Sequence, residues 1–248
     1  MTRETNASDE QLNSRDSLKE LYQNSPVPID DLMTNLGLYI RGSALVKFLV
    51  INDLYLRIKD IPGVIAEFGV WYGQNLVLFE NLRAIYEPFN KTRQILGFDT
   101  FKGYEGFTDR DVNGEIFAAG NYATLQDYKG YVQKLIGIHE NNNILGHVSG
   151  NHTLVEGDVC KTAPEYFSAH PELTVALAYF DMGLYAPTKA ALLAIKPHLI
   201  PGSVILLDEF SWSAAKGEAI AFKEVFGVSG YKIEKSPLTP MRAIVTIL

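Results

Sequence analysis

Short apolar runs alternate with helical stretches through most of this chain, and that alternation constrains the fold more than any other feature. The apolar runs that predict strands are 64–68, 95–98, 153–156, 175–180 and 204–207. The predicted helices around them are 43–59, 74–86, 123–140, 163–170, 186–199 and 214–226. Strands that alternate with helices form βαβ units, in which a parallel sheet is buried on both faces and the crossovers are right-handed. We therefore expect an α/β fold with a doubly wound, mostly parallel sheet.

The C-terminal stretch departs from this rhythm. Residues 231–235 and 242–248 both predict strands, and the segment 236–240 between them reads Ser-Pro-Leu-Thr-Pro, with no helix. Consecutive strands joined by so short a segment pair antiparallel, because a parallel connection needs a long crossover. The sequence thus predicts a seven-stranded sheet that ends in an antiparallel hairpin.

The N-terminal part differs in character from the rest. Residues 1–27 are polar and lack a periodic apolar face, which predicts a flexible arm. Residues 28–62 predict a helical cap, and 63–248 predict one ligand-binding domain. Inside that domain the long aromatic and glycine-rich segment around 100–122 predicts a lid, because long loops in compact domains are usually functional. Asp109 and Arg110 are the candidate acceptor contacts of this lid.

Composition narrows the classes of partner. The 248 residues carry a formal net charge of -7, which disfavours a nucleic-acid partner because phosphate backbones are anionic. No stretch approaches the roughly 18 apolar residues of a membrane span, and the start lacks the apolar core of a signal peptide. The single cysteine, Cys160, permits no disulfide within the chain. We expect a cytoplasmic protein without a membrane partner, and a homo-oligomer stays open.

A turn with two glycines follows the first predicted strand and reads Glu67-Phe68-Gly69-Val70-Trp71-Tyr72-Gly73. Open α/β sheets bind ligands at the carboxyl ends of their strands, where glycine lets a ligand approach the backbone closely. A dinucleotide pyrophosphate loop would read G-x-G-x-x-G, a spacing that this turn lacks. The acid Glu67 suits a cationic or amine-bearing ligand better than a pyrophosphate, although a tight strand-to-helix turn without any ligand reads equally well.

Acids also end the next two strands. Asp99 follows the second strand, at the position where sheets of this kind bind a ribose diol. Asp158 follows the third strand, where a carboxylate can accept a hydrogen bond from an adenine amino group. Acids at three successive strand ends favour a nucleoside site over three unrelated loop residues.

A second set of acids follows the fourth and fifth strands. Asp181 ends the fourth strand, and Asp208 and Glu209 end the fifth. Three carboxylates in contact raise one another's pKa unless a cation lies between them. Oxygen ligands suit Mg²⁺, Ca²⁺ or Mn²⁺. The alternative is that these acids cap helices and no metal binds.

Together these segments resemble class I S-adenosylmethionine-dependent methyltransferases, and within them the macrocin O-methyltransferase family of sugar O-methyltransferases. The resemblance runs from about Tyr39 to the C-terminus. The segments that carry it, in this order, are 66–73, 97–103, 156–158, 181–188 and 201–209.

The resemblance implies a Rossmann-like methyltransferase fold that binds S-adenosylmethionine. The cofactor contacts that it implies are Glu67, Gly69, Val70, Gly73, Asp99, Phe101, Gly157, Asp158 and Val159. It further implies Mg²⁺ (or Mn²⁺) held by Asp181, Asp208 and Glu209, Asp181 as the catalytic base, and a small-molecule sugar or nucleotide-sugar acceptor. Two positions depart from the family pattern: Gly183 replaces a usual second Asp, and Glu209 replaces an Asp.

Other interpretations of the same residues stay open. An NAD-dependent oxidoreductase or epimerase would share the sheet, but the missing glycine spacing and the terminal hairpin disfavour it. A non-catalytic nucleoside-binding protein would retain the cofactor site and lose the metal. A metal-free methyltransferase would need another base, and the candidates are His139, His147 and His152.

Overall fold

The computed structural model describes residues 7–90, 92–112, 117–143 and 152–248. The chain divides into two compact units, Met1–Leu49 and Val50–Leu248, and the division falls within helix α3 (Gly42–Ile58). The smaller unit contains α1 (Asp9–Gln23), α2 (Ile29–Thr34) and the short 3₁₀ helix η1 (Leu36–Tyr39). The expected arm thus contains a helix, which begins with a capping box between Ser8 and Gln11 and buries no side chain. The expected boundaries after residues 27 and 62 remain predictions.

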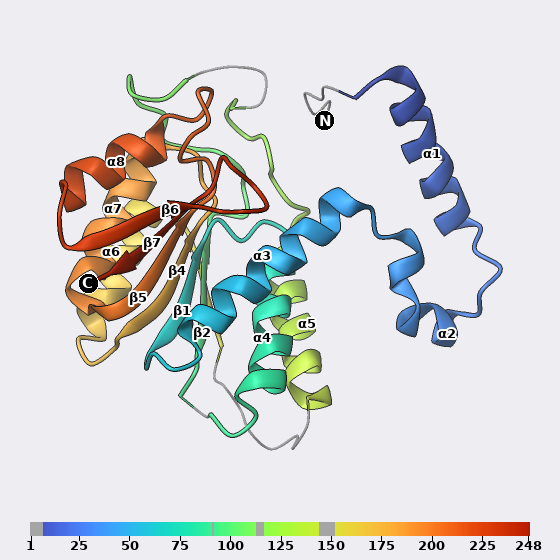
Figure 1. The fold of residues 1–248 in the computed structure, drawn as a ribbon, viewed down its shortest axis with the longest axis horizontal. Coiled ribbons are helices and arrows are strands. Elements are labelled where there is room, and N and C mark those ends of the chain that lie inside the picture. The colour runs from blue at the N-terminus through green and yellow to red at the C-terminus, as the bar shows by residue number, and fades with distance from the viewer. Residues whose placement is uncertain (1–6, 91, 113–116, 144–151) are drawn as a thin grey trace. The chain divides into compact units, whose positions relative to one another are not determined.

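The larger unit is built on a seven-stranded sheet (Figure 1). Its strands are β1 (Val64–Phe68), β2 (Ile95–Asp99), β3 (Thr153–Glu156), β4 (Val175–Phe180), β5 (Leu199–Leu207), β6 (Tyr231–Lys235) and β7 (Ala243–Ile247). Their order is β3-β2-β1-β4-β5-β7-β6, and only β7 pairs antiparallel, with β5 and with β6. The expected fold class is confirmed. The strand order reverses between β1 and β4, and such a switch point is where open sheets bind their ligands.

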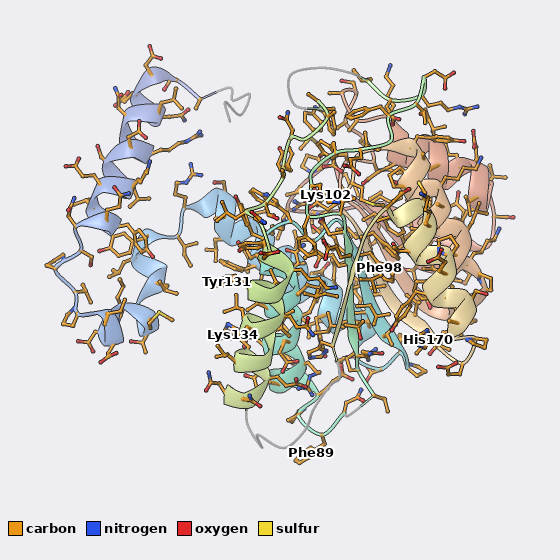
Figure 2. The ribbon with its side chains drawn as sticks, turned by 180° about the vertical axis from the view of Figure 1, so that it is seen from behind. Phe89, Phe98, Lys102, Tyr131, Lys134 and His170 are labelled. Carbon is orange, nitrogen blue, oxygen red and sulfur yellow. The ribbon has the colours of Figure 1, made fainter. Side chains whose placement is uncertain are left out.

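Helices cover both faces of this sheet. They are α4 (Gln74–Tyr86), α5 (Tyr128–Asn142), α6 (Val159–Ala169), α7 (Tyr185–Ile195) with the 3₁₀ turn η2 (Lys196–His198), and α8 (Gly217–Phe226). Helices α6, α7 and α8 lie on one face, and α4 and α5 lie on the other (Figure 1). Figure 2 shows Phe98 within the sheet layer and Tyr131 and Lys134 on the outer side of α5, as expected for a helix with one buried face.

Three helices begin three or more residues away from the expected start, and one of them is α8, which begins at Gly217 instead of residue 214. Helix α5 was expected from residue 123 but begins at Tyr128, because Asp127 adopts the left-handed conformation (φ 57°). Helix α6 was expected from Ala163 but begins at Val159, because the Asp158 side chain caps it by accepting from Cys160 N–H at 2.9 Å. None of the helices in the described part of the chain combines the length and the apolar character needed to cross a bilayer.

A stack of three aromatic rings sets the positions of the central strand ends. Phe68, Phe98 and Phe180 occupy matching positions on β1, β2 and β4, and their ring centroids lie 4.9 and 4.8 Å apart. All three rings are fully buried. Because β1 and β4 end at these rings and β2 ends one residue later, the residues that follow emerge together at one edge of the sheet.

A buried polar cluster lies towards the opposite end of the sheet, around Glu80 of α4. The Glu80 carboxylate accepts from Arg83 at 2.7 and 2.8 Å, from Asn143 at 2.9 Å and lies 2.7 Å from His152 Nε2. Burial opposes ionisation, but the hydrogen bonds from His152, Arg83 and Asn143 outweigh it and lower the pKa of Glu80 to about 2. His152 is therefore engaged at the amino end of β3, His139 lies on α5, and His147 lies outside the described residues.

The Glu80 cluster predicts acid sensitivity. A carboxyl group whose folded pKa lies below its ordinary value of 4.5 stabilises the fold above that value, and the stabilisation is lost as the pH falls towards 2. We expect the difference in unfolding free energy between wild type and Glu80→Gln to be largest at neutral pH and to shrink below pH 4.5. Urea unfolding across this range measures it, with exposed Glu165→Gln as control. A difference that is independent of pH would contradict the assignment.

Candidate active site

The turn that follows β1 is hydrogen-bonded to the end of β2. The Asp99 carboxylate accepts from Val70 N–H at 2.6 Å and Trp71 N–H at 2.8 Å through Oδ2, and from Phe101 N–H at 2.6 Å through Oδ1. Gly157, after β3, donates its N–H to the Asp99 carbonyl at 2.9 Å. Four of the residues expected at the cofactor, Val70, Asp99, Phe101 and Gly157, are thus brought together.

Glycine is required at both ends of this turn. Gly69 has φ +93°, and a Cβ there would lie 2.2 Å from the carbonyl oxygen of Asp181. Gly73 has φ +79° and stands at the N-terminus of α4 with no side-chain cap, so the first N–H groups of α4 are not satisfied by a capping side chain. The turn therefore combines close backbone packing with N–H groups suited to a ligand.

Two of the expected cofactor acids have local partners. Glu67 is 1% exposed, and its Oε1 accepts from Asn75 Nδ2 at 2.7 Å. Asp158 caps α6, whose first residue, Val159, is buried. Both lie at the carboxyl ends of their strands as expected, and their contacts with a cofactor remain predictions.

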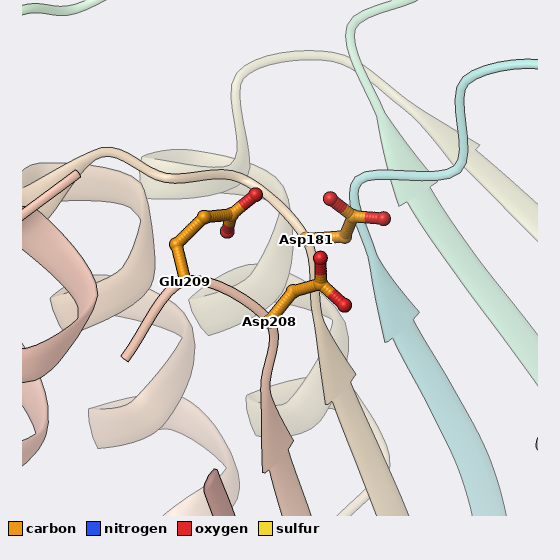
Figure 3. Close-up of side chains that lie close together, drawn as sticks. All are labelled: Asp181, Asp208 and Glu209. Atoms are coloured by element: carbon orange, nitrogen blue, oxygen red, sulfur yellow. The ribbon is translucent and has the colours of Figure 1, made fainter. Parts of the chain in front are cut away.

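The three acids expected at a metal converge. Asp181 follows β4, Asp208 and Glu209 follow β5, and one carboxylate oxygen from each lies within 4.8 Å of the others (Figure 3). Their backbone continues the sheet: Asp181 N–H donates to Phe68 at 2.9 Å, and Asp208 N–H donates to Phe180 at 3.0 Å. Parallel strand ends at one edge thus place all three side chains around one point.

One of these carboxylates is partly neutralised. Asp208 Oδ1 accepts from Arg242 Nε and, at 2.9 Å, from the Tyr179 hydroxyl, whereas Arg242 Nη2 lies 3.4 Å from Oδ2. Burial lowers the pKa of Arg242, but neighbouring Tyr179 and Asp208 outweigh burial and raise it, so the guanidinium stays charged. Of the two carboxylate oxygens of Asp208, Oδ2 therefore has fewer and longer hydrogen bonds.

The other carboxylates of this cluster repel one another. Within the described residues, Glu209 Oε2 is buried and has no hydrogen-bond partner. Burial, and then the charges of Glu218 and Asp208, raise the pKa of Glu209 well above its ordinary value. The charges of Asp181, Asp208 and the fully buried Glu218 all act on Glu209, and among the described residues the guanidinium of Arg242 is the cation that pairs with this cluster. An oxygen-only set with an unsatisfied buried carboxylate oxygen fits a hard divalent cation.

The expected lid packs beside this cluster. Tyr104 contacts Phe117 with ring centroids 5.3 Å apart, and Phe117 contacts Trp212 at 5.5 Å. Burial, and then the charges of Glu209 and Asp181, raise the pKa of Tyr104. Residues 113–116 of the lid lie outside the described part of the chain.

The two lid residues expected to contact the acceptor, Asp109 and Arg110, lie in different environments. Arg110 pairs with Glu224 of α8 and lies 5.0 Å from the ring centroid of Tyr185, whereas Asp109 is exposed. Asp111 anchors the lid, since its Oδ1 accepts from Tyr185 N–H at 2.7 Å. Contact of Asp109 or Arg110 with an acceptor remains a prediction.

Three neighbours of the carboxylates were not identified from the sequence: Arg242, Tyr179 and Glu218. A signal existed for Arg242, because antiparallel pairing of the last strand with β5 aligns Ala243 with Leu207 and so puts Arg242 beside Asp208. Tyr179 lies inside an apolar strand and Glu218 inside a helix, and neither position carries a motif.

Known proteins that are similar to this chain are methyltransferases. Residues 66–210 match the family described as "Methyltransferase domain". A crystal structure of CalS11, described as a calicheamicin methyltransferase, shares 38% identity at a TM-score of 0.92, covering 99% of this chain and 97% of that one. An apo structure of CalS11, described as a TDP-rhamnose 3'-O-methyltransferase, shares 36% identity at a TM-score of 0.84, covering 98% and 96%.

A curated relative is more distant. The 8-demethyl-8-(2,3-dimethoxy-alpha-L-rhamnosyl)-tetracenomycin-C 4'-O-methyltransferase of Streptomyces olivaceus is 23% identical over 171 residues, which is 68% of this chain and 61% of that protein. The structure of the O-methyltransferase NovP, 17% identical at a TM-score of 0.54 over 82% of this chain and 79% of its own, shows a likeness of fold alone. With the family matched over most of the chain and a relative similar along nearly its full length, this chain belongs to the methyltransferase family.

Proposed function

We propose that this methyltransferase transfers the methyl group of S-adenosylmethionine to a hydroxyl of a sugar, assisted by Mg²⁺ or Mn²⁺ at Asp181, Asp208 and Glu209. One observation carries the proposal. Gly69, in the turn that follows β1 and here called the cofactor turn, packs closely on the Asp181 backbone. A Cβ at Gly69 would come within 2.2 Å of the Asp181 carbonyl oxygen. The methyl donor and the carboxylate cluster would therefore adjoin, as a direct transfer requires.

The residues of the first three strand ends would hold the cofactor, which supplies an electrophilic methyl group when bound. Gly69 and Gly73 adopt the positive φ values of +93° and +79° that shape the turn, and we propose that its backbone faces the cofactor. A carboxylate has about four acceptor sites, of which Asp99 uses three for backbone N–H groups, so Oδ1 keeps one for a ribose hydroxyl. Asp158 is proposed beside the adenine, and Glu67 beside the methionine part.

The acids after β4 and β5 would act on the acceptor. A divalent ion bound there supplies charge that stabilises an alkoxide. Arg242 and Tyr179 orient Asp208 through Oδ1, which directs Oδ2 to the shared point. Asp181, next to the cofactor turn, is proposed to take the proton of the acceptor hydroxyl. The oxygen then forms its bond to the methyl carbon as the carbon–sulfur bond breaks, and the products are a methyl ether and S-adenosylhomocysteine.

The acceptor class rests on the relatives. One is described as a TDP-rhamnose methyltransferase and another as a methyltransferase of a rhamnosyl-tetracenomycin. At 38% identity over 99% of the chain, a nucleotide-bound deoxysugar is the acceptor we propose. Tyr104, Phe117 and Trp212 offer aromatic surface for the apolar side of such a sugar.

Two measurements test this function. S-adenosylhomocysteine at a hundred times its Kd should stabilise the protein by about 2.7 kcal/mol, because it binds only the folded state. Methyl-labelled S-adenosylmethionine should label TDP-rhamnose, detected by mass spectrometry, and should label TDP-glucose less. If NAD raised the melting temperature and S-adenosylhomocysteine did not, the proposed function would be wrong.

A further inference from the structure

Glu218, the second residue of α8, is a fully buried carboxylate that binds two separate turns. Its Oε1 accepts from Met182 N–H at 3.2 Å and from Gly183 N–H at 3.1 Å. Its Oε2 accepts from Glu209 N–H at 3.1 Å. Glu218 is 0% exposed, so these bonds are shielded from water.

The two turns are those that carry the metal-site acids. Met182 and Gly183 directly follow Asp181, and Glu209 directly follows Asp208. The ladder between β4 and β5 extends to the bond from Asp208 N–H to the Phe180 carbonyl. Beyond that bond the turns leave the sheet, and Glu218 is hydrogen-bonded to both of them. Glu218 thus connects the backbones of the two turns that carry Asp181 and Glu209.

Close packing at two glycines, one beside Glu218 and one that donates a hydrogen bond to it, fixes the position of Glu218. Gly217 packs so tightly that a Cβ would lie 2.4 Å from Tyr185 N, which locks the start of α8 onto the start of α7. Gly183 has φ +65°, and a Cβ there would lie 2.5 Å from Phe117. A side chain at 183 would therefore be strained and would meet the Phe117 ring, and the 182–183 backbone donates to the Glu218 carboxylate from α8.

We infer that Glu218 is a positioning residue of the metal site, which sets the distance between the Asp181 and Glu209 donors without itself being a ligand. The inference rests on the proposed function, because it presumes that the Asp181, Asp208 and Glu209 carboxylates hold a divalent ion. It also explains why three acids on two separate turns meet within 4.8 Å.

Charge and geometry can be separated by two variants. Glu218→Asp keeps the charge but is one methylene too short to reach both turns, and Glu218→Gln keeps the length but offers one acceptor oxygen instead of two. If Glu218 positions the donors, each variant should bind Mn²⁺ at least about tenfold more weakly, the effect of losing one hydrogen bond to a charged group. Electron paramagnetic resonance of Mn²⁺ on the full chain measures this, with exposed Glu165→Gln as the charge-matched control.

Two further readouts show that the fold and the cofactor site are intact. S-adenosylhomocysteine affinity should equal that of wild type in both variants, because the expected cofactor residues lie at β1, β2 and β3. In metal-free protein the amides of Gly183 and Glu209 should exchange hydrogen faster in Glu218→Asp than in wild type.

The outcomes distinguish the inference from the proposed function. Wild-type Mn²⁺ affinity in Glu218→Asp, with loss in Glu218→Gln, would mean that only the charge matters and would overturn the inference. Loss of S-adenosylhomocysteine affinity in both variants would show a general structural role and overturn it as well. Wild-type protein that does not bind Mn²⁺ would overturn the proposed metal site together with the inference.

Discussion

Replacing Asp181 by Asn should lower turnover by about 10²–10³-fold, the effect of removing one preorganised electrostatic group from an active site. Asp181 would hold the metal and accept the hydroxyl proton, and Asn does neither well. The affinity for S-adenosylhomocysteine should stay close to that of wild type, since the substitution keeps the side-chain shape. Turnover, KM for TDP-rhamnose and calorimetric Kd for S-adenosylhomocysteine measure the three quantities separately.

Chelation provides the matching test without mutation, since EDTA should abolish activity and Mg²⁺ or Mn²⁺ should restore it. Asp60→Asn is a suitable control, because Asp60 is 83% exposed. Asp208→Asn is a less clean probe, since it also leaves the partly buried Arg242 without its carboxylate partner and should cost stability. Full activity in EDTA, or wild-type turnover in Asp181→Asn, would refute the metal-assisted mechanism and leave the methyltransferase family untouched.

Gly69→Ala should damage the cofactor site and the fold together. The new Cβ would meet the Asp181 carbonyl oxygen at 2.2 Å and its carbon at 2.8 Å, at a φ of +93° that side chains rarely adopt. Overpacking against backbone together with the positive φ should destabilise the protein by about 3 kcal/mol. We also expect the affinity for S-adenosylhomocysteine to fall, because any relief moves the turn or Asp181.

A glycine elsewhere supplies the control. Gly130 lies on α5, is exposed and has open space where a Cβ would stand. Gly130→Ala should therefore raise stability by about 1 kcal/mol through helix propensity. Thermal unfolding and S-adenosylhomocysteine titration compare the two variants. A Gly69→Ala protein with the melting temperature and affinity of wild type would show that the turn is loose, contrary to its packing in the structure.

The positions of the expected site residues followed from chain-local patterns. Apolar runs mark the strands, and in a parallel sheet all carboxyl ends lie at one edge, so Asp99, Asp181 and Asp208 had to appear there. The glycines at 69 and 73 predicted close approach of a ligand to the backbone. In the structure Gly69 packs on the Asp181 carbonyl and Gly73 on the Val132 side chain, and contact with a ligand stays a prediction. The boundaries of α5 and α6 were less predictable, because single residues such as Asp127 and Asp158 set them.

By itself the sequence determined the sheet, its terminal hairpin and the acids at its ligand-binding edge, because strand periodicity and strand-end chemistry are local properties. Only the tertiary structure decided which groups neutralise and align those acids. Arg242 reaches Asp208 from β7, and Glu218 reaches Gly183 and Glu209 from α8. Such partners are distant along the chain and carry no motif. Their contacts arise from long-range packing of whole elements, which fixes the direction of a side chain that no local pattern encodes.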